Sequence, residues 1–256
     1  MCIRDRYTPS EVSKERHTVD LKVFGGSYQI DRVISNMGGL VDEVQLQQAQ
    51  KIKAAQALFN DTFINGDSAV DSKAFDGLDK ALTGSTTEYN NGADKIVIDL
   101  STSAKITENY MTFLDMLDEF LTGLDGTPDF LGVNTKMAAK IRACARRASM
   151  YQVTKDNWGQ QIEMYGNIPI IDLGAKAGSN DDIVKTDESG TTGIYAARLG
   201  LDGLHGVSMS GVSPIQTWLP DYTTSGAVKT GEVEMVAAIA LKASKAAAVF
   251  RNLKVK

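Results

Sequence analysis

The sequence predicts an α+β fold in which long helices are interleaved with short strands. Residues 40–64 contain no glycine or proline and are rich in Gln, Ala, Lys and Leu, most of which favour helices. Residues 17–24 alternate between apolar and polar side chains, which is typical of a half-buried strand. With 256 residues, the chain is long enough for one large core or two closely packed ones.

Composition describes an ordinary folded chain and argues against several classes of protein. Hydrophobic residues make up 43% of the chain, charged residues 23%, and the net charge is −5. An acidic balance argues against a dedicated nucleic-acid-binding protein. Cys2 and Cys144 give neither a disulfide framework nor the spacing of metal ligands, and no apolar run is long enough to span a membrane. We therefore expect no cofactor, no bound metal and no membrane partner.

The N-terminal strand candidate, residues 17–24, has one apolar face and one polar face. The residues on its apolar face are Val19, Leu21 and Val23. Gly25 and Gly26 are expected to end this strand, and residues 27–34 to continue as an extended or early helical piece. Because little local sequence can cover the apolar face, we expect neighbouring copies of the chain to cover it.

The long helix predicted over residues 40–64 would span about 35 Å. Its apolar side chains recur at steps of three and four residues, at Val41, Val44, Ile52, Ala55, Phe59 and Phe63. Asn65 and Gly66 follow, and both tolerate the left-handed backbone conformation that ends many helices. We therefore expect a left-handed stop at this point.

The middle of the chain predicts a strand over residues 96–100, an amphipathic helix over 104–122 and a strand over 130–133. Asn134 is placed to cap a helix over residues 135–150. That helix carries five basic side chains, which could contact phosphates, remain solvated or form ion pairs between subunits.

The rest of the chain is richer in strands. Residues 160–173 predict a hairpin that turns at Gly166 and Asn167, and residues 174–193 a polar, glycine-containing loop. Residues 194–198 predict a strand. Alternating apolar side chains over residues 232–242 also indicate a strand, although their alanines leave a helix open.

Catalytic chemistry has few candidates in this sequence. A Ser-His-Asp site would need His205 with Ser208 or Ser210 and Asp202, but no G-x-S-x-G turn accompanies them. A loop or packing role for His205 is the better interpretation, and we expect no catalytic residue.

An acidic loop is the other chemical candidate. Its carboxylates are Asp181, Asp182, Asp187 and Glu188. They could attract calcium, but the twelve-residue calcium-loop pattern is absent. We expect a solvated loop, and the sequence as a whole predicts a protein that is not an enzyme.

One pair of motifs stands out between residues 59 and 82. Residues 63–67, FINGD, end the long helix, and residues 75–78, FDGL, follow after a short turn-rich link. This pair resembles the corresponding segment of tailed-bacteriophage major capsid proteins, whose fold is shared with encapsulin shells and the floor of herpesvirus capsids. From about residue 15 onward, the order of elements is similar to that fold, with residues 40–64 as its spine helix.

The resemblance implies a phage major-capsid fold with an extended N-terminal loop, a peripheral domain and an axial domain. The implied parts are the returning arm of the extended loop (7–34), the peripheral domain (35–100), the axial domain (101–219) and the closing strands of the peripheral domain (220–256). Residues 1–6 resemble translated adapter sequence, and we expect the native start to differ from them.

The resemblance also implies a function. It predicts a structural coat subunit that assembles with itself into hexamers and pentamers of an icosahedral shell around double-stranded DNA. The other partners would be a portal, scaffold or decoration proteins, and DNA through weak, non-specific contacts. The chain would be located in the virion after assembly in the bacterial cytoplasm. An encapsulin-like shell that encloses a cargo enzyme is the alternative.

Two groups of residues are candidates for assembly contacts. The group on the N-terminal arm consists of Val19, Leu21, Val23 and Phe24. The group on the acidic loop consists of Asp181, Asp182, Asp187 and Glu188. The resemblance directs the loop, residues 174–193, toward the symmetry axis of the capsomer. Subunit contacts are expected to exceed about 2,000 Å² per pair, as in obligate assemblies.

Overall fold

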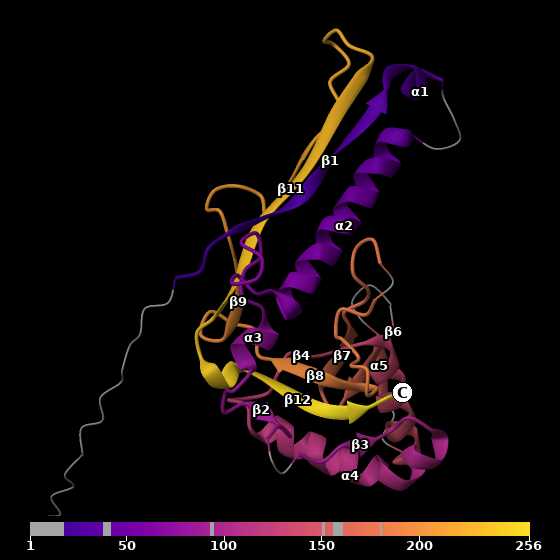
Figure 1. Cartoon of the computed structure of the whole chain (residues 1–256), viewed down its shortest axis with the longest axis vertical. Coiled ribbons are helices and arrows are strands. Elements are labelled where there is room, and N and C mark those ends of the chain that lie inside the picture. Colours follow the sequence, from indigo (N-terminus) through magenta and orange to yellow (C-terminus); the bar gives the residue numbers. More distant parts are fainter. Residues whose placement is uncertain (1–17, 38–41, 93–94, 150–151, 156–160, 180) are drawn as a thin grey trace, which may run out of the picture.

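Two sheets form the framework of the molecule in a computed structural model that describes residues 18–37, 42–92, 95–149, 152–155, 161–179 and 181–256. A four-stranded sheet forms a long ribbon that rises from a lower body built on an eight-stranded sheet (Figure 1). The elements in chain order are β1 (Lys22–Asp31), α1 (Arg32–Asn36), α2 (Glu43–Asn65), α3 (Leu78–Leu82), β2 (Glu88–Tyr89), β3 (Ile98–Asp99), α4 (Ser103–Thr122), β4 (Phe130–Val133), α5 (Thr135–Arg147), β5 (Gln152–Lys155), β6 (Gln161–Tyr165), β7 (Ile168–Asp172), β8 (Thr191–Ala197), β9 (Leu204–Ser208), β10 (Ile215–Trp218), β11 (Val228–Leu241) and β12 (Ala247–Lys254).

The ribbon is longer than the sequence predicted. β1 pairs antiparallel with β11 over ten residues, from Lys22 opposite Ala237 to Asp31 opposite Val228. Gly25 was expected to end the strand, yet it pairs with Glu234 inside the ladder. The close approach of the two strands explains this glycine, because a Cβ there would lie 2.0 Å from the Val233 carbonyl oxygen. The prediction that the strand ends at Gly25 is therefore wrong.

The phase of the N-terminal strand also differs from the prediction. Phe24, Tyr28 and Ile30 are each at most 5% exposed, whereas Val23 is 64% exposed. The alternation of the residues before Lys22 does not decide which side chains of the strand are buried, because the regular strand begins only at Lys22. The buried face of the ribbon packs on α2 (Figure 1). The face of Val19, Leu21 and Val23 is exposed, and its cover by neighbouring copies stays a prediction.

The long helix is confirmed as α2. Asp42 caps its first turn by accepting hydrogen bonds from the backbone N–H groups of Val44 and Gln45. Its end differs from the prediction, because Gly66 has φ −60° and not a left-handed conformation. Close packing explains this glycine, since a Cβ there would lie 2.2 Å from the Phe75 carbonyl oxygen.

The lower body holds the largest core. Its strands run in the order β2-β12-β8-β4-β7-β6-β5, and β3 also pairs with β12. α4 lies along the bottom of the body in Figure 1, and its Phe113 ring stacks on Phe250 of β12 with centroids 6.4 Å apart. The predicted hairpin is confirmed as β6 and β7, and α5 ends at Arg147 instead of residue 150.

The C-terminal segment contributes to both sheets. Residues 232–242 form part of β11, which confirms the strand over the helix. The chain then enters β12, which pairs with β8 on one side and with β2 and β3 on the other. Hydrogen bonds therefore tie residues 247–254 both to β8 of the segment 101–219 and to β2 and β3 of the segment 35–100.

Candidate assembly surfaces

The arm that leads into β1 exposes apolar side chains. Val19 is 41% exposed and Leu21 37%, and both precede the regular strand, at whose start Val23 is also exposed. Phe24 differs, because it is 2% exposed and packs edge-on against Phe59 and Phe75. Of the four arm residues predicted for assembly, three therefore face solvent in the single chain, and Phe24 belongs to its core.

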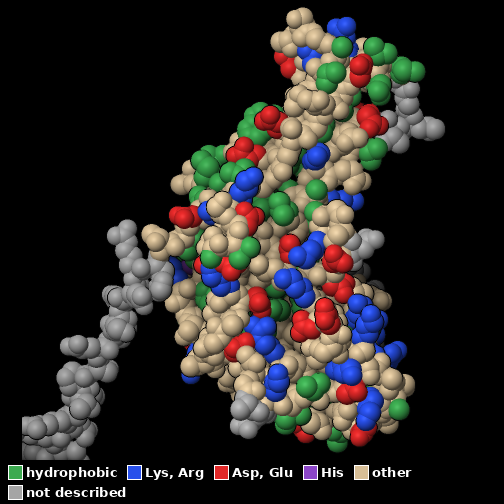
Figure 2. Space-filling view, in the orientation of Figure 1, with side chains coloured by type: hydrophobic (Ala, Val, Ile, Leu, Met, Phe, Trp, Pro, Cys, Tyr) green, Lys and Arg blue, Asp and Glu red, His purple; other side chains and the backbone are tan. Residues whose placement is uncertain are grey.

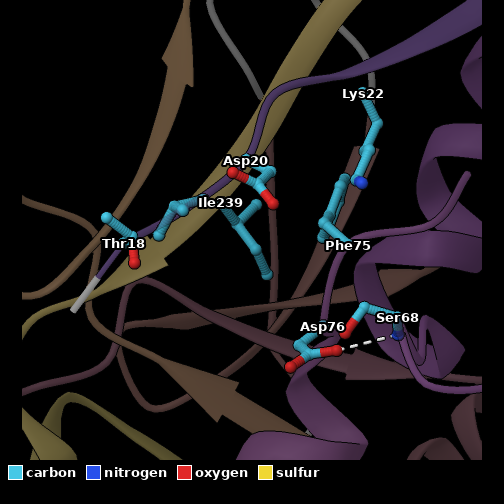
Figure 3. A pocket seen from close by; sticks show the side chains of 8 residues that line it. Thr18, Asp20, Lys22, Ser68, Phe75, Asp76 and Ile239 are labelled. Carbon is cyan, nitrogen blue, oxygen red and sulfur yellow. Dashed lines mark hydrogen bonds between the residues drawn. The ribbon is translucent and has the colours of Figure 1, made fainter. Parts of the chain in front are cut away.

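A small pocket of about 130 Å³ lies where this arm crosses the residues after α2 (Figure 3). Thr18 and Asp20 line it from the arm, and Ser68 and Asp76 from the opposite side. Lys22 bridges the two sides, since its ammonium group donates to the Ser72 carbonyl oxygen at 2.9 Å. The arm is thus fixed to the body at the root of the ribbon.

The two sequence motifs of residues 63–67 and 75–78 meet directly. The Gly77 N–H donates to the Gly66 carbonyl oxygen at 2.9 Å. Lys80 of α3 bonds Asp67 at 2.6 Å and Asp76 at 2.9 Å. Hydrogen bonds from Ser68 and then from Lys80 lower the pKa of Asp76 to about 2. The motifs therefore form one clasp between α2 and α3.

The acidic loop does not stand alone as a patch of negative charge. Asp182 lies 3.5 Å from the Lys136 ammonium group, and Asp187 accepts a hydrogen bond from Thr191 at 3.1 Å. Lys176 and Lys185 line the same open groove as Asp181 and Glu188. All four predicted acidic residues therefore lie on one surface, but lysines are interspersed among them.

The same loop is anchored to the core through Ile183 and Val184, which are at most 2% exposed. The Asn65 amide donates to the Ile183 carbonyl oxygen at 2.8 Å, and the Asn134 amide to that of Val184 at 3.0 Å. The loop is therefore held against the ends of α2 and α5. Sequence alone did not indicate this anchoring role for the two asparagines, although it did predict Asn134 as a helix cap.

A second exposed apolar surface, which we call the tip patch, lies at the far end of the ribbon. Figure 2 shows hydrophobic side chains gathered there. The tip patch consists of residues that are 53–77% exposed: Val33, Ile34, Met37 and Val228. The tip patch is not among the surfaces predicted from the sequence, although three apolar side chains within residues 33–37, next to a Gly-Gly break, are a usable signal.

The catalytic candidate is not assembled. His205 lies in β9, and its Nδ1 is buried without a hydrogen-bond partner. The Asp202 carboxylate pairs with Arg198 at 2.8 Å, and Ser208 and Ser210 are exposed. Across the described ranges, no hydrogen bond joins these residues to His205, and no group of three His, Cys, Asp or Glu side chains could hold a metal ion.

Membrane insertion has no support in the helices that the structure describes, since none combines the length and apolar character needed to span a bilayer.

Comparison with known proteins gives matches of structure but not of sequence. No protein-family model and no curated protein matches the sequence. The SrpI encapsulin complex of Synechococcus elongatus is similar to 92% of this chain, over 75% of its own, with 18% identity and a TM-score of 0.63. The capsid of an empty GTA particle covers 98% of this chain and 79% of its own, with 12% identity and a TM-score of 0.54. A structure from Mycobacterium phage Bobi matches 91% of this chain over 72% of its own chain, with 8% identity and a TM-score of 0.51. The chain therefore has the fold that phage capsid proteins share with encapsulins, as residues 63–67 and 75–78 indicated.

Proposed function

We propose that this chain is the major coat protein of a tailed bacteriophage, which assembles with itself into hexamers and pentamers of an icosahedral shell around double-stranded DNA. The observation that carries the proposal is the protruding ribbon, which exposes apolar side chains at its root and its tip. Val23 is 64% exposed and Met37 77%. Exposed apolar groups of this kind, on an element that extends from the body, mark a surface for other protein chains.

Burial of these side chains between copies would drive assembly. Removing apolar surface from water stabilises by about 25 cal/mol per Å². An arm that carries Val19, Leu21 and Val23, together with the tip patch, gives each copy two separate apolar contacts. Two contacts on one chain allow it to join more than one neighbour, as a closed shell requires.

The acidic loop has a proposed place in the same assembly. Residues 174–193 would face the symmetry axis, where five or six copies of Asp181, Asp182, Asp187 and Glu188 gather. The lysines of the same groove, Lys136 and Lys176 among them, would partly offset the repulsion between these carboxylates. A portal, scaffold or decoration proteins and loosely held DNA complete the proposed partners, with assembly in the bacterial cytoplasm.

An encapsulin-like shell around a cargo enzyme is the second candidate. The observation that favours it is the higher TM-score of the SrpI encapsulin, 0.63 against 0.54 and 0.51 for the two capsid structures. The contents of purified particles distinguish the two functions. Packaged DNA supports the coat protein, and a co-purifying enzyme supports the encapsulin. Neighbouring genes for a terminase and a portal, or for a cargo enzyme, give an independent answer.

Electron microscopy and light scattering of the expressed chain test the shared proposal. Closed particles of uniform diameter are expected. A chain that stays monomeric at high concentration while keeping native stability would overturn both functions. His205→Ala serves as a control, because a role in packing predicts unchanged assembly.

A further inference from the structure

We propose that Asn91 is a site of spontaneous deamidation, and that the other Asn-Gly pair of the chain, Asn65-Gly66, is protected by the fold. In this reaction the backbone nitrogen of Gly92 bonds to the side-chain carbonyl carbon of Asn91. The amide nitrogen leaves as ammonia, taking up the proton that the Gly92 nitrogen loses. Water then opens the cyclic imide at either carbonyl, leaving aspartate or isoaspartate. Asparagine is a thermolabile residue, and glycine as its successor leaves the attacking nitrogen unobstructed.

The local structure at Asn91 leaves this attack open. Both Asn91 and Gly92 are exposed and lie outside helices and strands. No hydrogen bond joins the Gly92 N–H to any described residue. Gly92 has φ +114°, and a Cβ built on it would meet nothing within 4 Å, so open space lies beside its Cα.

The neighbouring residue keeps the turn in place without restraining Gly92. The Asn90 amide donates to the carbonyl oxygens of Ile96 and Arg251, at 2.7 and 2.9 Å. The backbone carbonyl oxygen of Asn90 accepts a hydrogen bond from the Asn252 amide at 2.7 Å. Asn90 thus holds this loop in place. Asn91 beside it is exposed and its amide donates to Glu88, but the Gly92 nitrogen that must attack is not restrained.

The second Asn-Gly pair lies in the opposite environment. Asn65 is the last residue of α2, and its amide donates to the Asp61 carboxylate at 2.7 Å and to the Ile183 carbonyl oxygen at 2.8 Å. The Gly66 N–H donates to the Thr62 carbonyl oxygen at 2.9 Å, and Gly66 is buried. Unlike the Gly92 nitrogen, the Gly66 nitrogen is therefore held in a hydrogen bond inside the fold, and the Asn65 amide is held as well.

The reaction would change the charge beside one partly buried ion pair, Glu88 with Arg251. Burial opposes ionisation of Glu88, but hydrogen bonds from the Gly84 N–H, the Asn91 amide and Arg251 together lower its pKa. Deamidation removes one of these donors and puts a new carboxylate beside Glu88. Both changes raise the pKa of Glu88 and weaken its pairing with Arg251, which joins β2 to β12.

Peptide mass spectrometry of the folded chain, aged in buffer, tests the proposal. We expect the peptide with Asn91 to gain about one dalton and to separate into aspartate and isoaspartate forms, while the peptide with Asn65 stays unchanged. The rate should rise with pH, because the attack requires a deprotonated backbone nitrogen. In denaturant, both pairs should react at similar rates. Equal rates at the two sites in the folded chain would overturn the proposal, as would an intact Asn91 after the denatured chain has reacted.

Two variants separate the chemistry from a general loosening of the fold. Gly92→Ala should slow the reaction at Asn91, because a methyl group obstructs the nitrogen. Gly174→Ala is the matched control, since Gly174 also has a positive φ, +80°, with nothing within 4 Å of its Cβ. Gly174 follows Leu173 and not an asparagine, so Gly174→Ala should leave the deamidation rate at Asn91 unchanged. Equal slowing in both variants would contradict the assigned site.

Discussion

The backbone N–H of Gly77 donates to the carbonyl oxygen of Gly66 across 2.9 Å and joins the end of α2 to the start of α3. Neither glycine has room for a side chain. A Cβ on Gly77 would lie 2.6 Å from the Ile64 carbonyl oxygen and 2.8 Å from the Gly66 nitrogen. Because all of these neighbours are backbone atoms, they cannot move aside independently.

Replacement of Gly77 by alanine should therefore destabilise the chain strongly. We expect a loss of about 3 kcal/mol in the free energy of unfolding, as for severe overpacking. Gly206→Ala is the control, because a Cβ there meets nothing within 4 Å and its φ is not positive. Urea unfolding measures both variants, and equal midpoints would show that the clasp tolerates a side chain.

Asn134 should contribute more stability than an ordinary helix cap. It is 1% exposed, accepts from the Met137 N–H and donates to the Val184 carbonyl oxygen. Asn134→Ala leaves buried groups without partners, so we expect a loss of about 3 kcal/mol. Thr102→Ala removes the cap of α4 and should cost only about 1 kcal/mol. Similar losses in thermal unfolding would contradict the anchoring role of Asn134.

The free energy of unfolding should fall at acid pH because Asp76 becomes protonated. Hydrogen bonds from Ser68 and Lys80 lower its pKa from 3.8 to about 2 in the folded chain. A carboxyl group with a lowered folded-state pKa stabilises the fold above its unfolded pKa, and this contribution is lost as pH falls from about 4 to about 2. Asp76→Asn should remove this loss of stability between about pH 4 and pH 2. The loss should amount to only about 1 kcal/mol, because solvent screens this half-exposed group. An unchanged acid limb would show that Asp76 is not responsible.

Val23→Lys should block assembly without unfolding the chain. The side chain is 64% exposed, so a lysine remains hydrated in the monomer, whereas a contact between copies would bury its charge. Val70→Lys is the comparison, because Val70 is 86% exposed but lies outside the proposed contact surfaces. Light scattering reports assembly and circular dichroism reports folding. Normal particles from Val23→Lys would remove this residue from the interface.

Substitution of Asp181 and Asp187 by asparagine should change the salt dependence of the assembled particles. If five or six copies of the loop meet at an axis, fewer like charges should make capsomers less sensitive to low ionic strength. The monomer should keep its stability, because Asp181 and Asp187 are exposed. Dissociation measured across a salt series provides the check, and identical curves for variant and parent would argue against an axial loop.

Local signals in the sequence were sufficient for the three long helices, α2, α4 and α5, and for the family resemblance. The glycine-free run before Asn65 and the cap at Asn134 both depend on neighbours in sequence, so α2 and the start of α5 were predicted correctly. The phase of β1 was not, because Phe24 is buried by Phe59 and Phe75, which are distant in sequence.

The same limit explains the elements that were missed. β10 is short and is defined by its pairing with β11, in which Trp218 lies opposite Glu232. Its exposed side chains show no clean alternation. Of the candidate sites, the arm residues Val19, Leu21 and Val23 came from the alternation of residues 17–24, and their part in assembly stays a prediction. The lysines beside the acidic loop were not, because Lys136 comes from a different helix.

The continuous path from β11 into β12 has a mechanical consequence. A pull on the tip of the ribbon acts along β11, whose ladder with β1 has hydrogen bonds perpendicular to the strands. Such a force shears the ladder, so its bonds share the load instead of opening one after another. The tension then passes through Ser244–Ala246 into β12, which is held by β8 on one side and by β2 and β3 on the other. The ribbon is thus tethered to a largely buried strand of the body, and a pull on its tip would be borne by covalent backbone.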